Sequence, residues 1–462
     1  MKTILVPIFN GIVARNFFRT DIYRNLISDF DIRIVVVIPS SKLEFYRKQF
    51  NKPKLILEPL DNIGEIRFGA LLAGLAFNLL PTRTIWFRQY DRYLKYGNYF
   101  NFLLKRSINF FLGPFQFPKK IIRFLDRFVP ADEEVLALLK KYHPNLLFTP
   151  DIAFGVDRVF LRAAKRKNIP SMAMVRSWDN LTSKGVIQIL PDKLIAYTER
   201  MKKQAIKYAG MPEKGIVVTG PPGYDDFFRK PSLSREEFFR KIGVDPVKRL
   251  ILFSPFYDRF TGSAVKMINN LVDAIENGKL PRNIHLLVRY RPATPEIPEG
   301  VIKKSPYVSI SKPCESYFPI KTSLMLARKD WEFSEDDMQL LLHSLYFCDV
   351  MVNTFSTLTI DAAAFDKPSI GIRFDADPAC PEIHSVKFVP DRHDHYKELE
   401  ATGGVRLVRS MEELVRAING YLENPRLDAE GRKKMREEQI QFFDGLSGKR
   451  VAEEIKKVIY KV

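Results

Sequence analysis

The sequence has few cysteines and no long hydrophobic run, and both absences restrict its class. Three cysteines occur in 462 residues, Cys314, Cys348 and Cys380, and none belongs to a CxxC pair. Such spacing argues against a disulfide framework or a cysteine-based metal site and indicates a reducing compartment. The longest uncharged run, residues 68–82, is shorter than the roughly 18 residues that a membrane-spanning helix needs.

Several motifs of catalysis and metal binding are also missing. The sequence contains no P-loop, no HExxH and no GxSxG. His393 and His395 form an HxH pair, but no third ligand stands at a fixed spacing, which favours a solvated loop over a metal site. We therefore expect a metal-independent protein without a cofactor of its own.

Positive charge, in contrast, is abundant. Lys and Arg number 73 against 54 Asp and Glu, which gives a net charge of +19 at pH 7. An excess of this size indicates an anionic partner: nucleic acid, acidic lipid or a phosphorylated substrate. Nucleic acid is the weakest of the three, because the sequence has no zinc finger, RRM signature or Arg-rich arm.

Short apolar runs alternate with helical patterns along the chain. The runs are TILVPI, IRIVVVIP, KLILEP, NLLFTP, PSMAMV, KLIAY and GIVVTG, then RLILFSP, IHLLVRY, DVMVNT, PSIGIRF and GVRLVRS. This alternation predicts parallel sheets covered by helices on both faces. The first run resembles a signal peptide, but Pro7 and Gly11 interrupt it, so we interpret it as a strand and a turn. We expect a cytoplasmic protein, and membrane contact at its surface stays open.

A segment rich in Pro, Gly and Ser divides the chain. Residues 220–234, GPPGYDDFFRKPSLS, have no apolar period and are typical of a linker. We predict an N-terminal Rossmann-like domain, a linker, a second Rossmann-like domain and a C-terminal helix, over residues 1–222, 223–234, 235–440 and 441–462. Ser234 and Ser334, each followed by acids, are expected helix N-caps. Two such domains in series imply a cleft that their strand ends face.

Residues from about 67 to 127 break the alternation. They give no strand signal, and in their second part aromatic side chains alternate with cations. Between Arg83 and Arg127 the only acids are Asp91 and Asp126. A helical insertion with cations on one face and aromatics on the other can lie on an anionic bilayer. The alternative, which we weigh equally, is that the aromatics pack on the domain and the cations are solvated.

One polar turn follows the expected strand that ends at Val352. Asn353 opens the turn, and Ser356, Thr357 and Thr359 lie where a helix begins. Free backbone N–H groups and the helix dipole attract anions there, and hydroxyls add donors to phosphate oxygens. Asp361, further along, lies where it could meet a ribose diol. The alternative is that Ser356 is an ordinary N-cap and Asp361 a solvated acid.

A second polar loop follows the strand PSMAMV. It reads VRSWDNLTSKG and gathers an aromatic ring, an acid, an amide, hydroxyls and a cation. We interpret it as substrate-binding, against the alternative of an Asx-capped turn with an inward Trp. The candidate side chains are Ser177, Trp178, Asp179, Asn180 and Lys184. Asn10 and Gly11, in the turn after the first strand, are further substrate-binding candidates.

The two stretches resemble GT-B glycosyltransferase-superfamily proteins. In that superfamily a strand, a polar turn and a helix that hold the donor's phosphates and ribose precede a G/D-K-P element, which here is Asp366-Lys367-Pro368. Many members carry two Glu separated by seven residues. Asn353 and Asp361 hold those positions here, which disfavours retaining enzymes of that type. Residues 145–226 and 249–372 are most similar to CDP-glycerol glycerophosphotransferases and surface-polysaccharide transferases.

The resemblance implies an α/β fold with two Rossmann-like domains facing a cleft, and the helical insertion lies in the first of them. It implies a transferase that moves a sugar or polyol phosphate from a nucleotide sugar or CDP-polyol to a surface-glycan or lipid-linked acceptor. In related proteins a basic element points at the donor diphosphate, and Arg289 and Arg291 match it; the alternative is that they are ordinary surface arginines. Asp151, then Asp179, are the candidate bases for the acceptor hydroxyl, and for either a structural Asx turn is as well supported.

Two other functions stay open. A non-hydrolysing UDP-N-acetylglucosamine 2-epimerase shares the fold, although such enzymes usually have His where Arg291-Pro292 stands here. An inactive GT-B scaffold that binds glycan or membrane is the second, because Asn353 replaces an acid.

Overall fold

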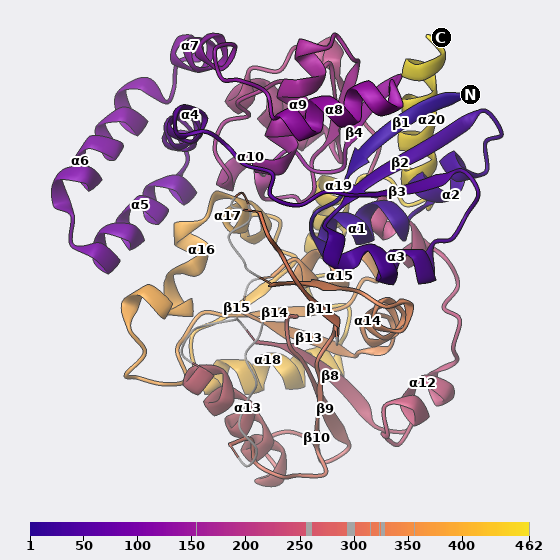
Figure 1. The fold of residues 1–462 in the computed structure, drawn as a ribbon. Helices are drawn as coiled ribbons and strands as arrows, with labels where there is room; N and C mark the ends of the chain where they lie inside the picture. The colour runs from indigo at the N-terminus through magenta and orange to yellow at the C-terminus, as the bar shows by residue number, and fades with distance from the viewer. Residues whose placement is uncertain are drawn as a thin grey trace. The chain divides into compact units, whose positions relative to one another are not determined.

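The computed structural model describes residues 1–153, 155–255, 261–292, 301–314, 316–322, 324, 329–354 and 356–461 (Figure 1). The chain forms two compact units. Unit 1 contains residues 1–228, 316–332 and 440–462, and unit 2 contains residues 229–315 and 333–439. The first passage between the units, after Phe228, falls within residues 223–234, and residues 441–462 return to unit 1.

Unit 1 is built on a parallel sheet that, in its described residues, has seven strands in the order β3-β2-β1-β4-β5-β6-β7. The strands are β1 Lys2–Pro7, β2 Ile32–Ile38, β3 Leu55–Pro59, β4 Leu146–Thr149, β5 Ser171–Met174, β6 Lys193–Ala196 and β7 Ile216–Val218. Most are buried on both faces, which explains why they are continuous apolar runs in the sequence.

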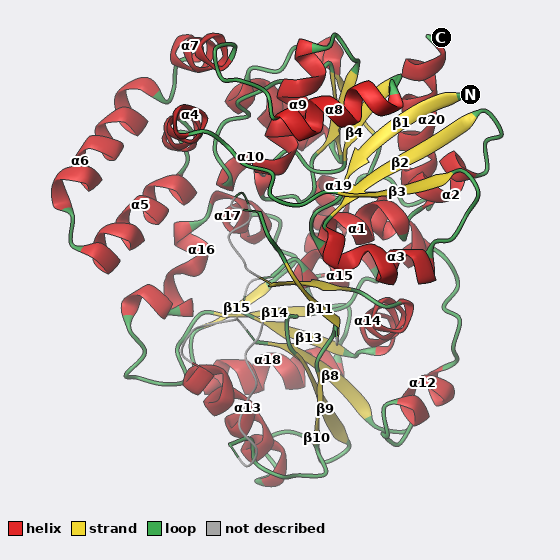
Figure 2. Cartoon of the chain, viewed as in Figure 1, coloured by secondary structure: helices red, strands yellow, loops and turns green. Residues whose placement is uncertain are grey.

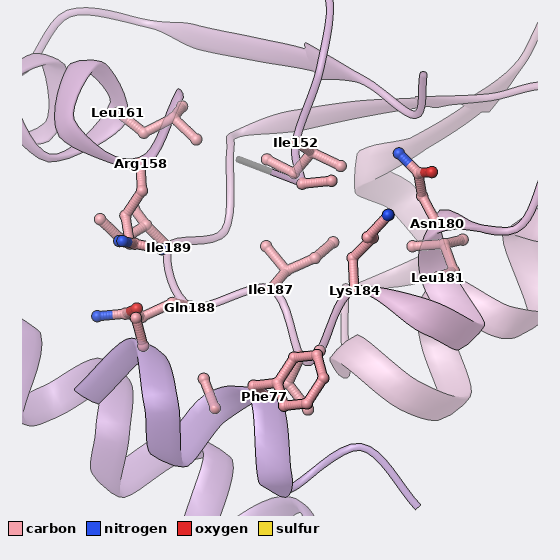
Figure 3. Close-up of a pocket in the computed structure, with 15 residues that line it drawn as sticks. Phe77, Ile152, Arg158, Leu161, Asn180, Leu181, Lys184, Ile187, Gln188 and Ile189 are labelled. Carbon is pink, nitrogen blue, oxygen red and sulfur yellow. The ribbon is translucent and has the colours of Figure 1, made fainter. Parts of the chain in front are cut away.

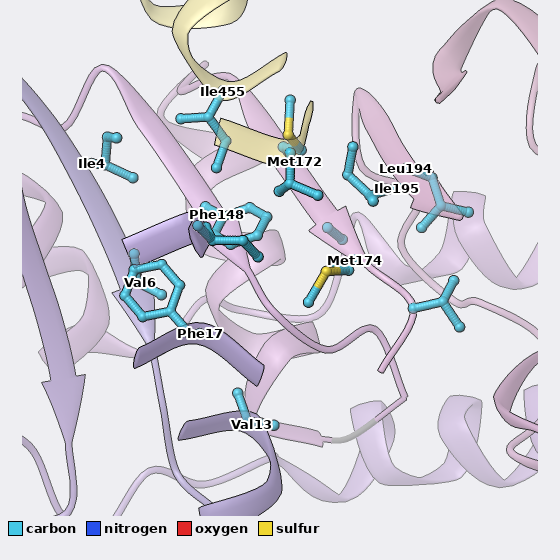
Figure 4. Close-up of a cluster of buried hydrophobic side chains, with 14 of the residues drawn as sticks. Ile4, Val6, Val13, Phe17, Phe148, Met172, Met174, Leu194, Ile195 and Ile455 are labelled. Atoms are coloured by element: carbon cyan, nitrogen blue, oxygen red, sulfur yellow. The ribbon is translucent and has the colours of Figure 1, made fainter. Parts of the chain in front are cut away.

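Helices cover both faces of this sheet (Figure 2). They are α1 Gly11–Phe18, α2 Asp21–Ile27, α3 Leu43–Gln49, α8 Glu133–Tyr142, α9 Gly155–Arg166, α10 Asn180–Ser183, α11 Glu199–Gln204 and α20 Ser447–Tyr460. On one face, Phe17, Phe148 and Ile455 pack in one cluster although they come from α1, β4 and α20 (Figure 4). The other face packs Val135 of α8 and Phe160 of α9.

The predicted insertion in unit 1 is helical, as expected. It consists of α4 Arg67–Asn78, α5 Arg83–Tyr96, α6 Tyr99–Ser107, the π-helical turn η2 Ile108–Leu112 and α7 Gln116–Asp126. Thr82 and Asn98 cap α5 and α6, and Gly97 ends α5 in the left-handed conformation. A small apolar core that includes Leu72, Ile85 and Val186 joins the insertion to the body of the unit.

A short hairpin returns to unit 1 from late in the sequence. Its strands are β11 Ser316–Pro319 and β12 Lys329–Glu332, and they pair antiparallel. Buried Lys42 places its Nζ 2.5 Å from both Asp330 and Glu332, and Tyr46 donates to Glu332 at 2.5 Å. These buried ionic contacts fix the hairpin against the start of α3.

Unit 2 is a second parallel α/β domain, whose described residues form a six-stranded sheet in the order β10-β9-β8-β13-β14-β15. The strands are β8 Arg249–Ser254, β9 Ile284–Arg289, β10 Val308–Ser311, β13 Val350–Asn353, β14 Ser369–Ile372 and β15 Arg406–Val408. The helices are α12 Arg235–Lys241, α13 Thr261–Glu276, α14 Glu335–Phe347, α15 Leu358–Ala364, α16 Val389–Arg392, α17 Asp394–Glu400, α18 Met411–Glu423 and α19 Ala429–Gln439.

The local signals in unit 2 were correct. Ser234 and Ser334 each form a capping box, with Glu237 and Asp337 respectively. The prediction of two parallel-sheet α/β domains is confirmed. The shorter helical turns are η1 Ser40–Lys42, η3 Ala205–Ala209, η4 Glu213–Gly215, η5 Pro222–Phe228, η6 Glu382–His384 and η7 Val386–Phe388.

Candidate functional site

Each sheet has a point where the strand order reverses, and the candidate residues gather at these points. In unit 1 the reversal lies between β1 and β4, which are paired from Ile4 with Leu146. In unit 2 it lies between β8 and β13, where Ser254 is paired with Asn353. Open parallel sheets bind ligands outside the strand carboxyl ends at such reversals.

Asp151 follows β4 at the reversal of unit 1. It is fully buried, and its Oδ1 accepts a hydrogen bond from the Ala153 N–H at 2.8 Å. Its Oδ2 lies 3.2 Å from Arg176 Nη1. Burial raises the pKa of Asp151, and the positive charge of Arg176 partly opposes that rise. A carboxylate with a raised pKa beside one cation is a candidate general base.

Asp157 is a second buried acid at this place, and sequence analysis missed it. It lies in the first turn of α9. Burial, and then the charge of Asp151, raise the pKa of Asp157 well above its ordinary value of 3.8. Asp157 therefore holds its proton more tightly than an exposed acid does. The available signal in the sequence was an acid placed among Val156, Val159 and Phe160.

Other side chains hold the backbone of Arg176 in place. The Tyr197 hydroxyl donates to the Arg176 carbonyl at 2.9 Å, and Asn16 of α1 donates to the same carbonyl at 3.2 Å. The backbone that carries the Arg176 guanidinium is thus fixed from β6 and from α1. The result is an ordered acid–cation cluster rather than a flexible loop.

The loop Val175–Gly185 contributes polar groups beside this cluster. Asn180 is buried, and among the described residues neither its side-chain oxygen nor its nitrogen has a hydrogen-bond partner. Burial lowers the pKa of Lys184, whereas the charge of Asp179 raises it. Asn180 and Lys184 line a cavity of about 60 Å³ together with Ile152 and with Phe77 of α4 (Figure 3). The cavity is small and mostly apolar, and Arg158, Asn180, Lys184 and Gln188 are the polar residues of its lining.

The remaining residues of that loop are more structural. Ser183 donates its hydroxyl hydrogen to Asp179 at 2.8 Å, and the Ser177 carbonyl accepts from the Asn180 N–H. Trp178 is buried. Burial lowers the pKa of Arg88 of α5, and the charge of Asp179 opposes this change, so the insertion contributes a cation to the same surroundings.

Asn10 and Gly11 are occupied by contacts within unit 1. The Asn10 side chain caps α1 by accepting from the Val13 N–H at 3.0 Å. The Gly11 N–H donates to Asp330 at 2.7 Å, and a Cβ at Gly11 would lie 2.0 Å from the Trp331 carbonyl oxygen. The carboxylate of Asp330 therefore occupies the place at the Gly11 N–H where an anionic ligand would bind.

In unit 2, Asn353 organises the turn after β13. Its amide nitrogen donates to Thr359 Oγ1 at 3.0 Å, and its amide oxygen accepts from the Ser356 N–H at 3.3 Å. Asn353, Thr359 and Asp361 are buried, whereas Thr357 is exposed and its hydroxyl caps no N–H group of α15. Ser356 and Thr357 are therefore accessible to a ligand, and Asn353 and Thr359 shape the loop that presents them.

The two arginines at the end of β9 differ. Arg289 is buried and donates to Ser311 Oγ at 3.0 Å and to the Asp337 carbonyl at 3.2 Å, and burial lowers its pKa to about 10. Its guanidinium ties β9 to β10 and α14. Arg291 is exposed.

Within the described ranges, no three His, Cys, Asp or Glu side chains are grouped as metal ligands.

No protein-family model and no curated protein sequence matches the chain. Solved structures do match over its full length. The UDP-GlcNAc 2-epimerase from Neisseria meningitidis bound to UDP-GlcNAc has a TM-score of 0.54 at 12% identity, with 99% of this chain and 100% of that one covered. S. aureus MnaA with UDP has a TM-score of 0.56 at 12% identity, covering 100% and 98%. A glycosyltransferase from Rickettsia africae has a TM-score of 0.51 at 13% identity, covering 100% and 99%. These likenesses show the GT-B fold, which glycosyltransferases and epimerases share.

Proposed function

We propose that the chain is an enzyme of nucleotide-activated sugars or polyol phosphates, and that unit 2 binds the nucleotide. The observation that carries the proposal is the turn at the unit 2 reversal, which the Asn353 amide holds open with Ser356 and Thr357 accessible. Backbone N–H groups and hydroxyls in such a turn bind phosphate oxygens. Structural neighbours with the same fold carry UDP or UDP-GlcNAc, which supports this choice of ligand.

The reaction we favour is transfer to an acceptor hydroxyl. Asp151 would accept the acceptor's proton in unit 1, and Lys184 and Asn180 would bind the acceptor's phosphate or hydroxyl groups. Hydroxyls and N–H groups of the turn, together with Arg291, would stabilise the charge on the leaving nucleotide without a metal ion. The resemblance to CDP-glycerol glycerophosphotransferases favours a surface glycan or lipid-linked acceptor and a cytoplasmic, membrane-facing enzyme.

A second candidate is an epimerase, and the buried acids favour it. Asp151 and Asp157 are close enough for the charge of one to raise the pKa of the other. Two acids with separated pKa values can remove a proton from a sugar carbon and return one to the other face. In a transferase only one of the two needs to exchange a proton.

The test combines calorimetry with product analysis. We expect UDP, CDP or GDP to bind, and Thr357→Ala with Asp361→Ala to weaken that binding by about 0.5–1.5 kcal/mol for each lost hydrogen bond. Incubation with nucleotide sugars and no acceptor distinguishes the candidates. Slow donor hydrolysis that persists in EDTA supports a transferase, and epimer formation supports an epimerase. Absence of binding to all nucleotides would leave an inactive scaffold.

A further inference from the structure

Unit 1 exposes an unusually large apolar surface on its insertion. We call the exposed side chains of α6, η2 and α7 and the residues that follow them the aromatic face. Its members are exposed by 42–78% of their area: Phe100, Leu103, Leu104, Phe110, Phe111, Leu112, Phe115, Phe117, Phe124 and Phe128, with Ile121 at 41%. A contiguous exposed apolar patch normally marks an interaction site. Figure 1 shows α5 and α6 at the edge of unit 1, away from its sheet.

Helix α7 is oriented with its polar side inward. Buried Asp126 pairs with Arg162 at 2.8 Å and accepts from Gln188 at 2.6 Å. Arg123 donates to the carbonyls of Ile187 at 2.9 Å and Ala209 at 2.5 Å. Four buried or half-buried polar contacts therefore fix the helix rotation, because breaking a buried ion pair is costly.

This rotation places the apolar side chains outward. Phe117, Ile121, Phe124 and Phe128 recur at intervals of four, three and four residues and are exposed by 71%, 41%, 55% and 66%. These intervals put Phe117, Ile121 and Phe124 on one face of α7, and Phe128 follows in the turn after the helix. The orientation follows from the contacts of Asp126 and Arg123, so the apolar face is a built feature of the fold.

Polar side chains fix α6 and η2 in the same way. Asn109 is buried and donates to the carbonyls of Asn78 at 2.9 Å and Leu80 at 2.7 Å. Gln89 of α5 donates to Asn78 at 2.9 Å and to the Lys105 carbonyl at 3.3 Å. The apolar residues Phe100, Phe110 and Phe111 are left on the outside.

The exposed charges within residues 83–127 have one sign. Five exposed cations belong to the same stretch: Arg83, Arg92, Lys95, Lys120 and Arg127. The two acids between residues 83 and 127, Asp91 and Asp126, are not exposed. Exposed aromatics between exposed cations match the interface of a bilayer that contains anionic lipids. A second copy of the chain would bring the same cations against each other, which disfavours self-association through this face.

We propose that the aromatic face docks unit 1 on an anionic lipid bilayer, with the rings inserted at the headgroup level and the cations beside lipid phosphates. The helices lie on the membrane and do not cross it: within the described residues no single helix is long and apolar enough to span, although the bent pair α4–α5 passes that test by length and composition. The docking does not depend on the proposed chemistry. It would place the cavity lined by Phe77, Asn180 and Lys184 near the lipid surface, because α4 belongs to the same insertion.

The experiment is vesicle flotation with the full chain. The probes are vesicles of equal parts phosphatidylglycerol and phosphatidylcholine, and vesicles of phosphatidylcholine alone, at low and high salt. Wild type is expected to float with the anionic vesicles at low salt and to dissociate as salt rises. The aromatic variant combines Phe117→Ser, Phe124→Ser and Phe128→Ser. The cation variant combines Arg92→Glu, Lys95→Glu, Lys120→Glu and Arg127→Glu.

A matched control carries the same charge change elsewhere on unit 1. It combines Lys48→Glu, Lys52→Glu, Lys140→Glu and Lys214→Glu, all at exposed positions. Each cation near the surface strengthens binding roughly fivefold, so the cation variant is expected to bind at least tenfold more weakly than the control. The aromatic variant is expected to lose flotation, with an unchanged thermal unfolding profile because its substitutions are exposed.

Four results would overturn the proposal. They are absence of flotation by wild type, equal flotation with neutral vesicles, equal weakening by the control and the cation variant, and undiminished binding by the aromatic variant. Sedimentation equilibrium tests whether a second copy of the chain binds the aromatic face instead. If wild type forms a dimer, the aromatic variant does not, and neither binds vesicles, the aromatic face is a dimer interface. None of these measurements uses a nucleotide, so their failure is distinct from failure of the proposed function.

Discussion

At the scale of single residues, the acids at the unit 1 reversal are not equivalent. Asp151 faces Arg176, whereas Asp157 is buried beside the charge of Asp151. A general base must be able to lose its own proton first. The Arg176 cation, 3.2 Å from Asp151, favours the ionised form of that carboxyl. Asp151 is therefore the better candidate for the proposed base.

The first prediction concerns Asp151→Asn. We expect turnover to fall by about 10²–10⁴-fold, because general base catalysis contributes that much, and nucleotide affinity to stay unchanged because the proposed nucleotide site lies in unit 2. Steady-state kinetics and calorimetry measure the two effects separately. Asp179→Asn is the comparison, with a smaller expected loss because Ser183 already occupies that carboxylate. A larger loss for Asp179→Asn would reassign the base.

The second prediction concerns Asp157→Asn and pH. Folding raises the pKa of Asp157 above its ordinary value of 3.8. Above pH 3.8 the unfolded chain therefore releases the Asp157 proton, whereas the folded chain keeps it. Stability contributed by Asp157 is therefore fully present below that pH and is lost as pH rises toward the raised value. The asparagine variant cannot titrate at this position and so does not lose this stability. The free energy of unfolding of the variant minus that of wild type should therefore grow by about 1.4 kcal/mol per pH unit between pH 3.8 and the raised pKa. Urea unfolding at a series of pH values measures it, and a variant less stable than wild type at neutral pH would contradict the account.

At the scale of elements, the hairpin β11–β12 depends on buried charge. Lys42 is fully buried and contacts two carboxylates, Asp330 and Glu332. Removing the ammonium group leaves both acids buried without their cation, and burial already raises the pKa of Glu332. Lys42 therefore holds the hairpin to unit 1 through both carboxylates, and Tyr46 adds a hydrogen bond to Glu332.

The third prediction is that Lys42→Met destabilises unit 1 by about 3–5 kcal/mol, since an unpaired buried charge costs that much. Lys48→Met in α3, the helix that follows Lys42, is the matched control, because Lys48 is exposed, and it should change stability by less than about 0.5 kcal/mol. Denaturant unfolding of both variants makes the comparison. Equal stability of the two variants would show that the ion pairs contribute nothing net.

Elements differ in how well the sequence predicted them. The long parallel strands were found because strands buried on both faces are continuous apolar runs, as IRIVVVI is. The strands β10, β11 and β12 were missed because each has four residues with polar or half-exposed positions. The contacts of Lys42 with Asp330 and Glu332 join residues almost 290 positions apart, and no local pattern reports such a pairing.

The candidate site was predictable in the same uneven way. Asp151 and Asn353 were identified because polar residues that end apolar strands are placed by topology at one sheet edge. The hydrogen bonds of Arg289 to Ser311 and to the Asp337 carbonyl could not be predicted, because Ser311 lies in β10, a strand that the sequence did not indicate. Whether each candidate residue touches a ligand stays a prediction.

At the scale of the whole molecule, the chain order does not follow the order of the units. Residues 440–462 come after all of unit 2, yet α20 packs on the first sheet. Asp225 fixes the start of α20 by accepting from the N–H groups of Ser447 at 2.9 Å and Gly448 at 2.7 Å. Ile455 is fully buried in the same core as Phe17 and Phe148. A substitution that creates a cavity in α20 should therefore lower the stability of unit 1.

The last prediction tests this arrangement by hydrogen exchange with mass spectrometry. Ile455→Ala leaves a cavity in the core of unit 1 and should cost about 2–5 kcal/mol there. Amides of β1, β2 and β4 are then expected to lose protection, while those of β8, β13 and β14 keep theirs, because the two cores are separate. Ile418→Ala in α18 is the reciprocal variant, since Ile418 is fully buried in the unit 2 core, and it should give the opposite pattern. Loss of protection in both sheets from either single variant would mean that the two units unfold as one cooperative body.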